Sequence, residues 1–269
     1  MNTITVVSLM SDNHEPFYRG VAEHLARRTG LPIQFAADAP WQERERMLRD
    51  GRAQMGFVCG QVYAHESAWL ELLAAPVMRD PRYNGLPVYF SDIVVRRGSR
   101  FRSFADLRGA RWAYNEPGSW SGCRVLEAHL AAQGETAAFC GSVVESGAHL
   151  RSLALILDGA IDAAAIDSTV LSFELAREPE LHSRIRCVAS LGPTAHPPAV
   201  IRRDVPVGTT HQLRAALLDM HGDRAAATIF DGQYTRFAAV QDADYQAIRQ
   251  KSRLAERARL TQAVGTVAV

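Results

Sequence analysis

The sequence predicts an α/β protein with largely parallel sheets. One observation predicts this class, and a second predicts how the chain is divided into lobes. Short apolar segments alternate with amphipathic helical segments along most of the 269 residues, and strands that are connected by helices pair in parallel. Two long extended segments, Val88–Arg97 and Ile185–Arg202, bracket a central block of strands and helices. This bracketing favours two lobes, the first discontinuous in sequence. The alternation by itself also fits one doubly wound domain.

The first lobe is predicted to begin with a strand at Thr3–Leu9 and an amphipathic helix at Phe17–Thr29. Gly30 is expected to end that helix, because glycine readily adopts the left-handed conformation of a C-cap. A strand (IQFAA), a helix (WQERERMLRDG), a strand at Ala53–Gly60 and the apolar run LLAAPVM follow. The turn-rich segment RDPRYNGLP then leads into the long strand that begins at Val88.

The central block is predicted to form the second lobe. Ser103 is a suitable N-cap for a short helix, SFADLRG, which precedes the strand ARWAYN and a helix from about Cys123 to Gln133. FCGSVVES and IDAAAID are predicted strands, and HLRSLALILDG and STVLSFELAREP are predicted helices. The segment His211–Leu260 is expected to be helical with one break at DGQYTRF. We therefore expect residues 1–86 with 191–269 to form lobe 1, and residues 87–190 to form lobe 2.

Composition and charge exclude several classes of partner. The net charge is +1, with acidic and basic residues interspersed, so neither a nucleic acid nor an anionic membrane surface is an expected partner. No apolar run approaches the roughly 20 residues that a transmembrane helix needs. The N-terminal segment MNTITVVSLMSDN lacks the basic and apolar regions of a signal peptide. We expect a cytoplasmic protein as the sequence stands, and a periplasmic one if a signal peptide has been removed.

The cysteines and histidines give no metal-binding pattern. Cys59, Cys123, Cys140 and Cys187 are scattered, without a CxxC pair or a metal-ligand spacing to a histidine. Burial as small hydrophobic residues is the favoured interpretation, and a disulfide between Cys123 and Cys140 stays open. The histidines form no HExxH motif. We expect no metal and no cofactor.

Two loops carry the residues that predict a binding site. In NEPGSWSG, Ser119 and Ser121 precede a helix, whose unpaired N–H groups and positive dipole end attract anions. A serine that merely caps the helix is the simpler interpretation of this loop alone. In ESGAHL, His149 begins another helix after a strand, where an imidazole can donate to an anion or lie half exposed without a ligand.

The two loops together resemble a known family. The order of VYFSDIVVRRGS, SFADLRGARWAY, the S-x-S-G loop, G-x-H and DGAIDAAAID is similar to that of the phosphate, phosphite and phosphonate substrate-binding proteins of ABC transporters. HEPFYRGVAEHLARRTGLPIQF and MLRDGRAQMGFVCGQVYA agree with the first lobe of that family, so the resemblance runs from about Asn2 to Pro206. It implies a type II periplasmic-binding-protein fold, with two α/β lobes that close on a ligand across two hinge strands.

The resemblance also implies which residues bind. In that family the S-x-S-G serines and the G-x-H histidine hold the phosphoryl oxygens, and two tyrosines line the cleft. The expected binding residues here are Ser119, Trp120, Ser121, Gly122, His149, Tyr63, Tyr89 and Asp167. No catalytic residue is expected. Either tyrosine fits an ordinary packing role equally well.

Two departures from the family bear on the ligand. Binders of aminoalkylphosphonates carry a carboxylate at the position of Thr169, and a threonine does not pair with an ammonium group as a carboxylate does. Asp167 is the nearest candidate replacement. Trp120 is bulkier than the small residue expected inside the anion loop, so it either shrinks the pocket or closes over an apolar substituent.

The leading hypothesis is a non-catalytic solute-binding protein that captures phosphonate, phosphite or phosphate in an interlobe cleft for an ABC permease. We expect a monomer or a weak dimer. The alternatives are a cytoplasmic enzyme on the same fold, with His149 and Asp167 as its acid–base pair, or a ligand-sensing subunit of a regulator.

Overall fold

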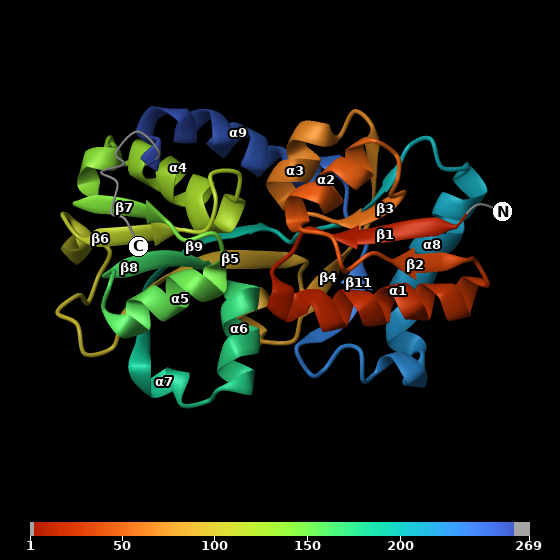
Figure 1. The fold of residues 1–269 in the computed structure, drawn as a ribbon, viewed down its shortest axis with the longest axis horizontal. Coiled ribbons are helices and arrows are strands. Elements are labelled where there is room, and N and C mark those ends of the chain that lie inside the picture. Colours follow the sequence, from red (N-terminus) through yellow and green to blue (C-terminus); the bar gives the residue numbers. More distant parts are fainter. Residues whose placement is uncertain (1–2, 261–269) are drawn as a thin grey trace. The chain divides into compact units, whose positions relative to one another are not determined.

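The computed structural model describes residues 3–260, so the predictions made for residues 1, 2 and 261–269 lie outside it. The chain divides into two compact units, each with its own sheet (Figure 1). Unit 1 contains the chain up to Val88 and Ala195–Gln246, and unit 2 contains Tyr89–Thr194 and the chain from Ala247 on. The sequence-based prediction had instead assigned residues 191–269 as a whole to the first lobe.

The sheet of unit 1 has six strands in the order β11-β4-β10-β3-β1-β2. β1 (Ile4–Ser8) pairs in parallel with β2 (Ile33–Phe35) and β3 (Met55–Phe57), as strands linked by helices are expected to do. The other three strands run antiparallel to their neighbours; they are β4 (Leu70–Met78), β10 (Ala199–Arg202) and β11 (Tyr234–Ala238).

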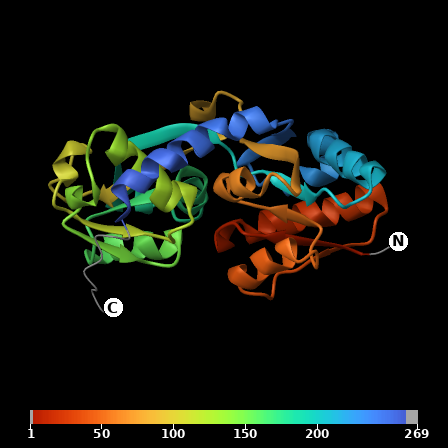
Figure 2. The same cartoon turned by 90° about the horizontal axis from the view of Figure 1, so that it is seen from above.

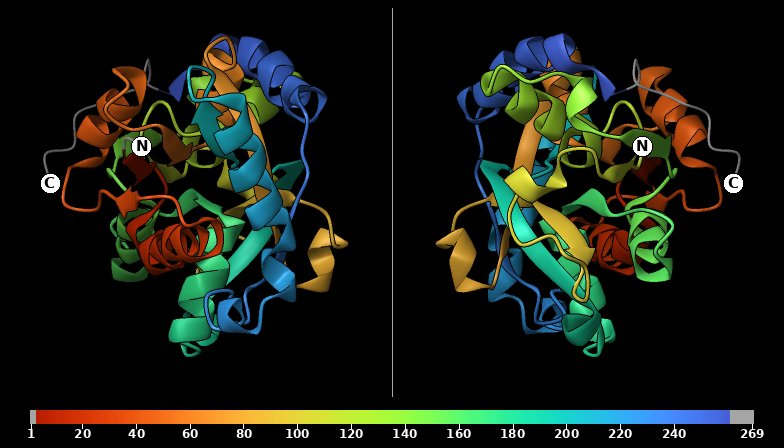
Figure 3. Two further views of the ribbon diagram at one scale, coloured as in Figure 1. Left: turned by 90° about the vertical axis from the view of Figure 1, so that its right-hand side faces the viewer. Right: turned by 90° about the vertical axis from the view of Figure 1, so that its left-hand side faces the viewer.

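The helices of unit 1 are α1 (Glu15–Thr29), α2 (Trp41–Arg49), α3 (Gly60–Glu66) and α8 (Val207–Asp219). α1 and α8 contact each other, as the left view of Figure 3 shows. α1 buries aromatic residues against the sheet: Phe17 stacks on Tyr234 and Tyr18 on Phe57, each pair with ring centroids 4.3 Å apart. Gly30 ends α1 with φ of 69°, the left-handed conformation that its sequence position predicts.

The sheet of unit 2 has five strands in the order β7-β6-β8-β5-β9. β6 (Arg111–Tyr114) is parallel to both β7 (Ser142–Glu145) and β8 (Ala163–Asp167). β5 (Val88–Arg96) is antiparallel to β8, and β9 (Ile185–Ala195) is the outer strand. The carboxyl ends of β6, β7 and β8 therefore lie at one edge of the sheet, where the segments that lead into the next helices begin.

The helices of unit 2 are α4 (Val125–Ala132), α5 (His149–Asp158), α6 (Ser168–Arg177), α7 (Leu181–Arg184) and α9 (Gln246–Ala255). In Figure 1, α4 and α9 lie above the strands of this unit, and α5, α6 and α7 lie below them. Figure 2 shows α9 beside α4 from above. A π-helical turn at Trp120–Arg124 precedes α4 directly.

Short 3-10 helices complete the described structure, at Asp12–His14, Pro81–Tyr83, Ala105–Leu107, Ala137–Phe139, Met220–Gly222, Arg224–Ala226, Asp242–Tyr245 and Glu256–Ala258.

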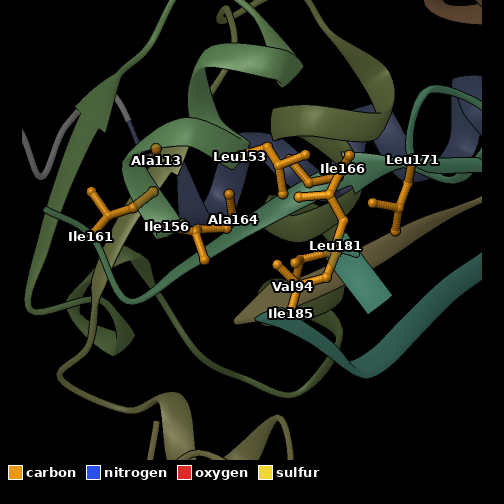
Figure 4. Close-up of a cluster of buried hydrophobic side chains, with 10 residues drawn as sticks. All are labelled: Val94, Ala113, Leu153, Ile156, Ile161, Ala164, Ile166, Leu171, Leu181 and Ile185. Atoms are coloured by element: carbon orange, nitrogen blue, oxygen red, sulfur yellow. The ribbon is translucent and has the colours of Figure 1, made fainter. Parts of the chain in front are cut away.

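One core of unit 2 fills the space between the sheet and the helices below it. Figure 4 shows ten buried side chains from β5, β6, β8, β9, α5, α6 and α7; they are Val94, Ala113, Leu153, Ile156, Ile161, Ala164, Ile166, Leu171, Leu181 and Ile185. Burial of each large aliphatic side chain contributes about 1.5–3 kcal/mol. This core fixes β8 and the start of α5, which carry two of the predicted binding residues.

Three local predictions differ from the structure. The break predicted at DGQYTRF contains a strand, β11, because Tyr234–Ala238 pairs with the edge of β4. Ser103 does not cap a helix; the carboxylate of Asp106 accepts the N–H groups of Arg102 and Ser103 instead. The favoured burial of the cysteines holds for Cys123 and Cys140, whereas Cys59 is half-buried and Cys187 is exposed; all four are free, so the disulfide left open between Cys123 and Cys140 is not formed. No helix within residues 3–260 is long and apolar enough to cross a membrane.

Candidate functional site

The loop between β6 and α4 is shaped by the two serines of the S-x-S-G motif, which have different roles. Ser119 is the N-cap of the π-helical turn, and its hydroxyl oxygen accepts the N–H of Gly122 at 3.2 Å. The carbonyl of Ser119 accepts the N–H of Arg124 at 3.0 Å, which is the i to i+5 bond of a π turn. Ser119 therefore caps the turn with a lone pair of its oxygen, which does not use its O–H donor, and Ser121 takes no part in this cap.

Ser121 lies at the centre of a buried polar cluster. Its Oγ is 3.2 Å from Nε2 of His149 and 3.3 Å from Oδ2 of Asp167. The three side chains come from the loop after β6, the start of α5 and the end of β8, and they meet because those segments follow neighbouring parallel strands. All three residues are buried. The structure thus brings together residues that are 28 and 46 positions apart in the sequence.

His149 is a buried neutral imidazole. Burial lowers its pKa to about 4, and the nearby backbone of Ala165 opposes this shift. At neutral pH the ring therefore carries one N–H donor and no charge. The interpretation of His149 as a half-exposed residue at a helix start is wrong, because only 7% of the residue is exposed.

Asp167 ends β8 and caps α6. Its Oδ1 accepts both the backbone N–H and the hydroxyl of Thr169, at 2.8 and 2.7 Å. Burial raises the pKa of Asp167 to about 6, while the hydrogen bonds from Thr169, the Val170 backbone and Ser121 act in the opposite direction. The carboxyl group is therefore within reach of protonation near neutral pH.

Trp120 and Gly122 pack the loop between β6 and α4 closely against neighbouring residues. The indole of Trp120 is 1% exposed, and its N–H donates to the hydroxyl of Thr194 at 3.3 Å. A Cβ on Gly122 would lie 1.8 Å from Oδ1 of Asn115 and 2.9 Å from Cε1 of His149. Position 122 therefore has room only for glycine.

Two residues of this site were missed by the sequence reasoning. Ser91 of β5 donates its hydroxyl to the carbonyl of Ser121 at 2.5 Å, and Asn115 packs its buried carboxamide against Gly122. Asn115 also accepts the N–H of Gly147 through its carbonyl, which joins the two anion loops. The signal for Ser91 was its position, with Asp92, as a polar residue inside the mainly apolar strand VYFSDIVV.

The two predicted tyrosines lie in different units. Tyr89 is buried on β5 of unit 2, and Tyr63 is buried on α3 of unit 1, where its hydroxyl donates to Oδ1 of Asp242 at 3.0 Å. The other predicted residues, from Ser119 to Asp167, belong with Tyr89 to unit 2.

Unit 1 has a separate hollow of about 530 Å³ near the start of β1. Its polar side chains are bonded within the protein: Gln54 donates to Gly51 and accepts from Thr5, and Arg202 pairs with Asp204. No group of three or more His, Cys, Asp or Glu side chains able to hold a metal ion occurs within residues 3–260.

The two mixed sheets with flanking helices form a fold of the type II periplasmic-binding-protein class. Residues 6–245 match the model of the family described as "ABC transporter, phosphonate, periplasmic substrate-binding protein". The chain belongs to this family.

Solved structures show the same fold at low sequence identity. The phosphonate-transporter binding protein PA3383 of Pseudomonas aeruginosa has a TM-score of 0.81 and 15% identity, over 94% of this chain and 86% of that one. PhnD1 of Prochlorococcus marinus in complex with methylphosphonate has a TM-score of 0.81 and 16% identity, over 95% and 98%. XAC2383 of Xanthomonas citri bound to ATP has a TM-score of 0.73 and 18% identity, over 98% and 100%.

Proposed function

We propose that this chain captures a small phosphorus oxyanion, such as a phosphonate, phosphite or phosphate, and delivers it to an ABC permease. The observation that carries the proposal is the buried cluster of Ser121, His149 and Asp167 behind the N-cap Ser119. Hydroxyl, imidazole and backbone N–H donors at the starts of two helices suit a tetrahedral oxyanion that brings its own negative charge. The family description supports a periplasmic location.

The remaining predicted residues complete the proposal. Trp120 and Gly122 fix the anion loop, and Tyr63 and Tyr89 are retained as candidate hydroxyl contacts on the strength of the family resemblance. We also propose that the protein is a monomer or a weak dimer.

The geometry of the cluster favours binding over catalysis. A serine nucleophile needs a histidine base whose other nitrogen is oriented by a third group, as in a catalytic triad. Here the carboxylate of Asp167 contacts Ser121, and Nδ1 of His149 has no hydrogen-bond partner among the described residues. No third group thus orients the far nitrogen of His149 for base catalysis, whereas a polar hydroxyl at the start of a helix is what a binding site needs.

Calorimetric titration with methylphosphonate, phosphite, phosphate, sulfate, ethylphosphonate and aminoethylphosphonate tests the proposal. We expect at least one phosphorus oxyanion to bind. Ethylphosphonate should bind more tightly than aminoethylphosphonate, because Thr169 stands where aminophosphonate binders carry a carboxylate and an unpaired buried ammonium is costly.

Two serine variants make the test specific to the site. Ser121→Ala should lower affinity for the best ligand at least about tenfold, since a hydrogen bond to a charged group contributes about 1.5–3 kcal/mol. Ser183→Ala is the matched control, because Ser183 lies in the same unit, is exposed and bonds only to the carbonyl of Glu180 through its hydroxyl. Equal affinity of both variants, or no binding of any phosphorus oxyanion, would reject the proposal.

A further inference from the structure

Ser121 has one hydroxyl hydrogen and more than one neighbour that can take it. Oδ2 of Asp167 lies 3.3 Å from its Oγ, and Nε2 of His149 lies 3.2 Å away on the ring that carries one N–H. When Asp167 is ionised, its carboxylate only accepts hydrogen bonds, so it takes the Ser121 hydrogen. Ser121 then has only lone pairs left for a third partner.

An ionised Asp167 is therefore incompatible with the role of Ser121 as an anion donor. The oxygen of the incoming anion would meet a serine lone pair, and its charge would lie close to a second buried negative charge. A like charge nearby disfavours ionisation of a carboxyl group, and burial strengthens the effect.

A protonated Asp167 removes both conflicts. Its O–H donates to Oγ of Ser121, and His149 in the tautomer with its N–H on Nε2 donates to the same oxygen, so the Ser121 hydrogen points at the anion. Oδ1 of Asp167 continues to accept the two bonds from Thr169. No atom has to move, because only the direction of the hydrogen bond between Asp167 and Ser121 reverses.

We propose that the oxyanion enters this site together with one proton, which resides on Asp167. The inference rests on the proposed function, and it assigns Asp167 as the residue that sets the donor or acceptor state of Ser121. Binding takes up a proton from solvent: the carboxylate oxygen gains it, and no bond of the ligand is made or broken.

Among the groups that face each other around Asp167, this carboxyl group is the one that titrates near neutral pH. α6 faces it with Thr169 and Val170, the anion loop with Ser121, and β5 with Ser91, which is its partner in the strand register. His149 at the start of α5 is the titratable neighbour across Ser121, and it is uncharged at neutral pH because its pKa is about 4. Asp92 follows Ser91 on β5 and so points to the opposite face of the sheet.

The expected pH dependence follows from the sign of the shift. In the free protein the pKa of Asp167 is raised to about 6, and the bound anion raises it further. Below pH 6 the carboxyl group is already protonated and this group has no effect on affinity. Above pH 6 the affinity should fall by up to about tenfold for each pH unit, until the pKa of the complex is reached.

Calorimetric titration of the whole chain with methylphosphonate between pH 5 and 8 tests the inference. At pH 7.5, titrations in two buffers of different ionisation enthalpy give the number of protons taken up per bound ligand. This number should be larger by one for the wild type than for Asp167→Asn. The amide of this variant can donate to Ser121 and accept from Thr169, so it reproduces the hydrogen bonds of the protonated acid. Its affinity should equal that of the wild type at pH 5 and exceed it at least tenfold at pH 8.

The comparison with Asp167→Asn cancels any proton that the ligand itself takes up. Asp92→Asn is the matched control, because Asp92 is equally buried and accepts a hydrogen bond from Ser190 on the neighbouring strand β9. It should keep the wild-type pH profile and proton uptake.

The outcomes separate the inference from the proposed function. Binding of methylphosphonate with equal proton uptake in the wild type and Asp167→Asn would overturn the inference and leave the proposed function intact. Failure of every phosphorus oxyanion to bind at any pH would overturn both. If Asp167→Asn does not fold, infrared difference spectra of the wild type decide, since ligand addition at pH 7.5 must produce the band of a protonated carboxyl group, and its absence rejects the inference.

Discussion

Gly122 shows how a single residue sets the geometry of the anion loop. A Cβ at this position would approach Oδ1 of Asn115 to 1.8 Å, a distance that no relaxation of the loop alone removes. The carboxamide of Asn115 is buried, and its backbone carbonyl bonds to Gly147 of the second anion loop. Displacing Asn115 therefore disturbs the serine loop and the histidine loop together.

The variant Gly122→Ala should consequently lose oxyanion binding and some stability. The inserted methyl group forces Asn115 and His149 apart, and overpacking of this kind typically costs about 1–3 kcal/mol. Calorimetry with methylphosphonate should show at least a tenfold loss of affinity, and urea unfolding should show a lower midpoint.

Gly118→Ala is the matched control in the same loop, because a Cβ there meets nothing within 4 Å. We expect it to keep wild-type affinity. If Gly118→Ala weakens binding as much as Gly122→Ala, the effect comes from loop flexibility, and the steric argument is wrong.

The residue scale also shows the limit of motif reasoning. The S-x-S-G motif predicts that both serines bind, and the structure adds that Ser119 also accepts the N–H of Gly122 while Ser121 contacts His149 and Asp167. A spacing of two residues does not reveal which hydroxyl caps the turn. That assignment depends on the π turn, which arises from the bond between Arg124 and Ser119 and has no signature in the sequence.

At the scale of elements, the segment after α9 is bonded to the helix that follows the anion loop. Glu127 on α4 is 1% exposed; its Oε1 accepts the N–H of Leu260 at 2.9 Å and its Oε2 accepts from Arg124 at 2.7 Å. Arg124 also pairs with Glu256. The π turn that carries Ser121 is thus held at its last residue by a segment from the C-terminal end of the described chain.

The variant Glu127→Gln should destabilise unit 2 in a pH-dependent way. Burial raises the pKa of Glu127 above the unfolded value of about 4.3. The stabilising contribution of the carboxyl group is then fully present below pH 4.3 and declines as the pH rises through the folded-state pKa. Because the amide does not titrate, the loss of stability in Glu127→Gln should be larger at pH 4.5 than at pH 7 in urea unfolding.

Glu135→Gln gives a control of opposite sign. Arg108 lowers the pKa of Glu135 through a hydrogen bond, so the contribution of this carboxylate is present above the unfolded pKa and declines as the pH falls. A loss in Glu127→Gln that instead grows from pH 4.5 to pH 7 would contradict the assignment.

The elements that sequence patterns predicted well are those whose signals are local. α1 ends at Gly30 and β8 covers the apolar run before Asp167, as expected. β11 was missed because a strand at the edge of β4 depends on its partner more than on its own residues. The assignment of α9 to unit 2 was missed for the same reason, since the contacts of the following 3-10 helix, Glu256–Ala258, with α4 are tertiary and no periodicity encodes them.

At the scale of the whole molecule, the numbers of positive and negative side chains are nearly equal. The chain has 30 Lys and Arg residues and 29 Asp and Glu residues, which gives a net charge of +1. Among the described residues, the hydrogen bonds of the anion-loop cluster join serine, threonine, histidine and aspartate side chains and backbone groups. A net charge near zero gives little long-range attraction for an anion, so the proposed ligand would be held through short-range donors.

Oxyanion affinity should accordingly depend weakly on ionic strength. The Debye length falls from about 10 Å at 0.1 M salt to about 3 Å at 1 M, which screens exposed charges but leaves buried hydrogen-bond donors nearly unaffected. We expect the dissociation constant for methylphosphonate to change less than about threefold between 0.05 and 0.5 M potassium gluconate, measured by calorimetry at pH 5.5, where Asp167 is mostly protonated. A parallel series in potassium chloride reveals direct competition by a small anion, which would appear as weakening in chloride alone. A steep loss of affinity in both salts would mean that an exposed cationic side chain holds the ligand, and the neutral-donor site proposed for unit 2 would then be incomplete.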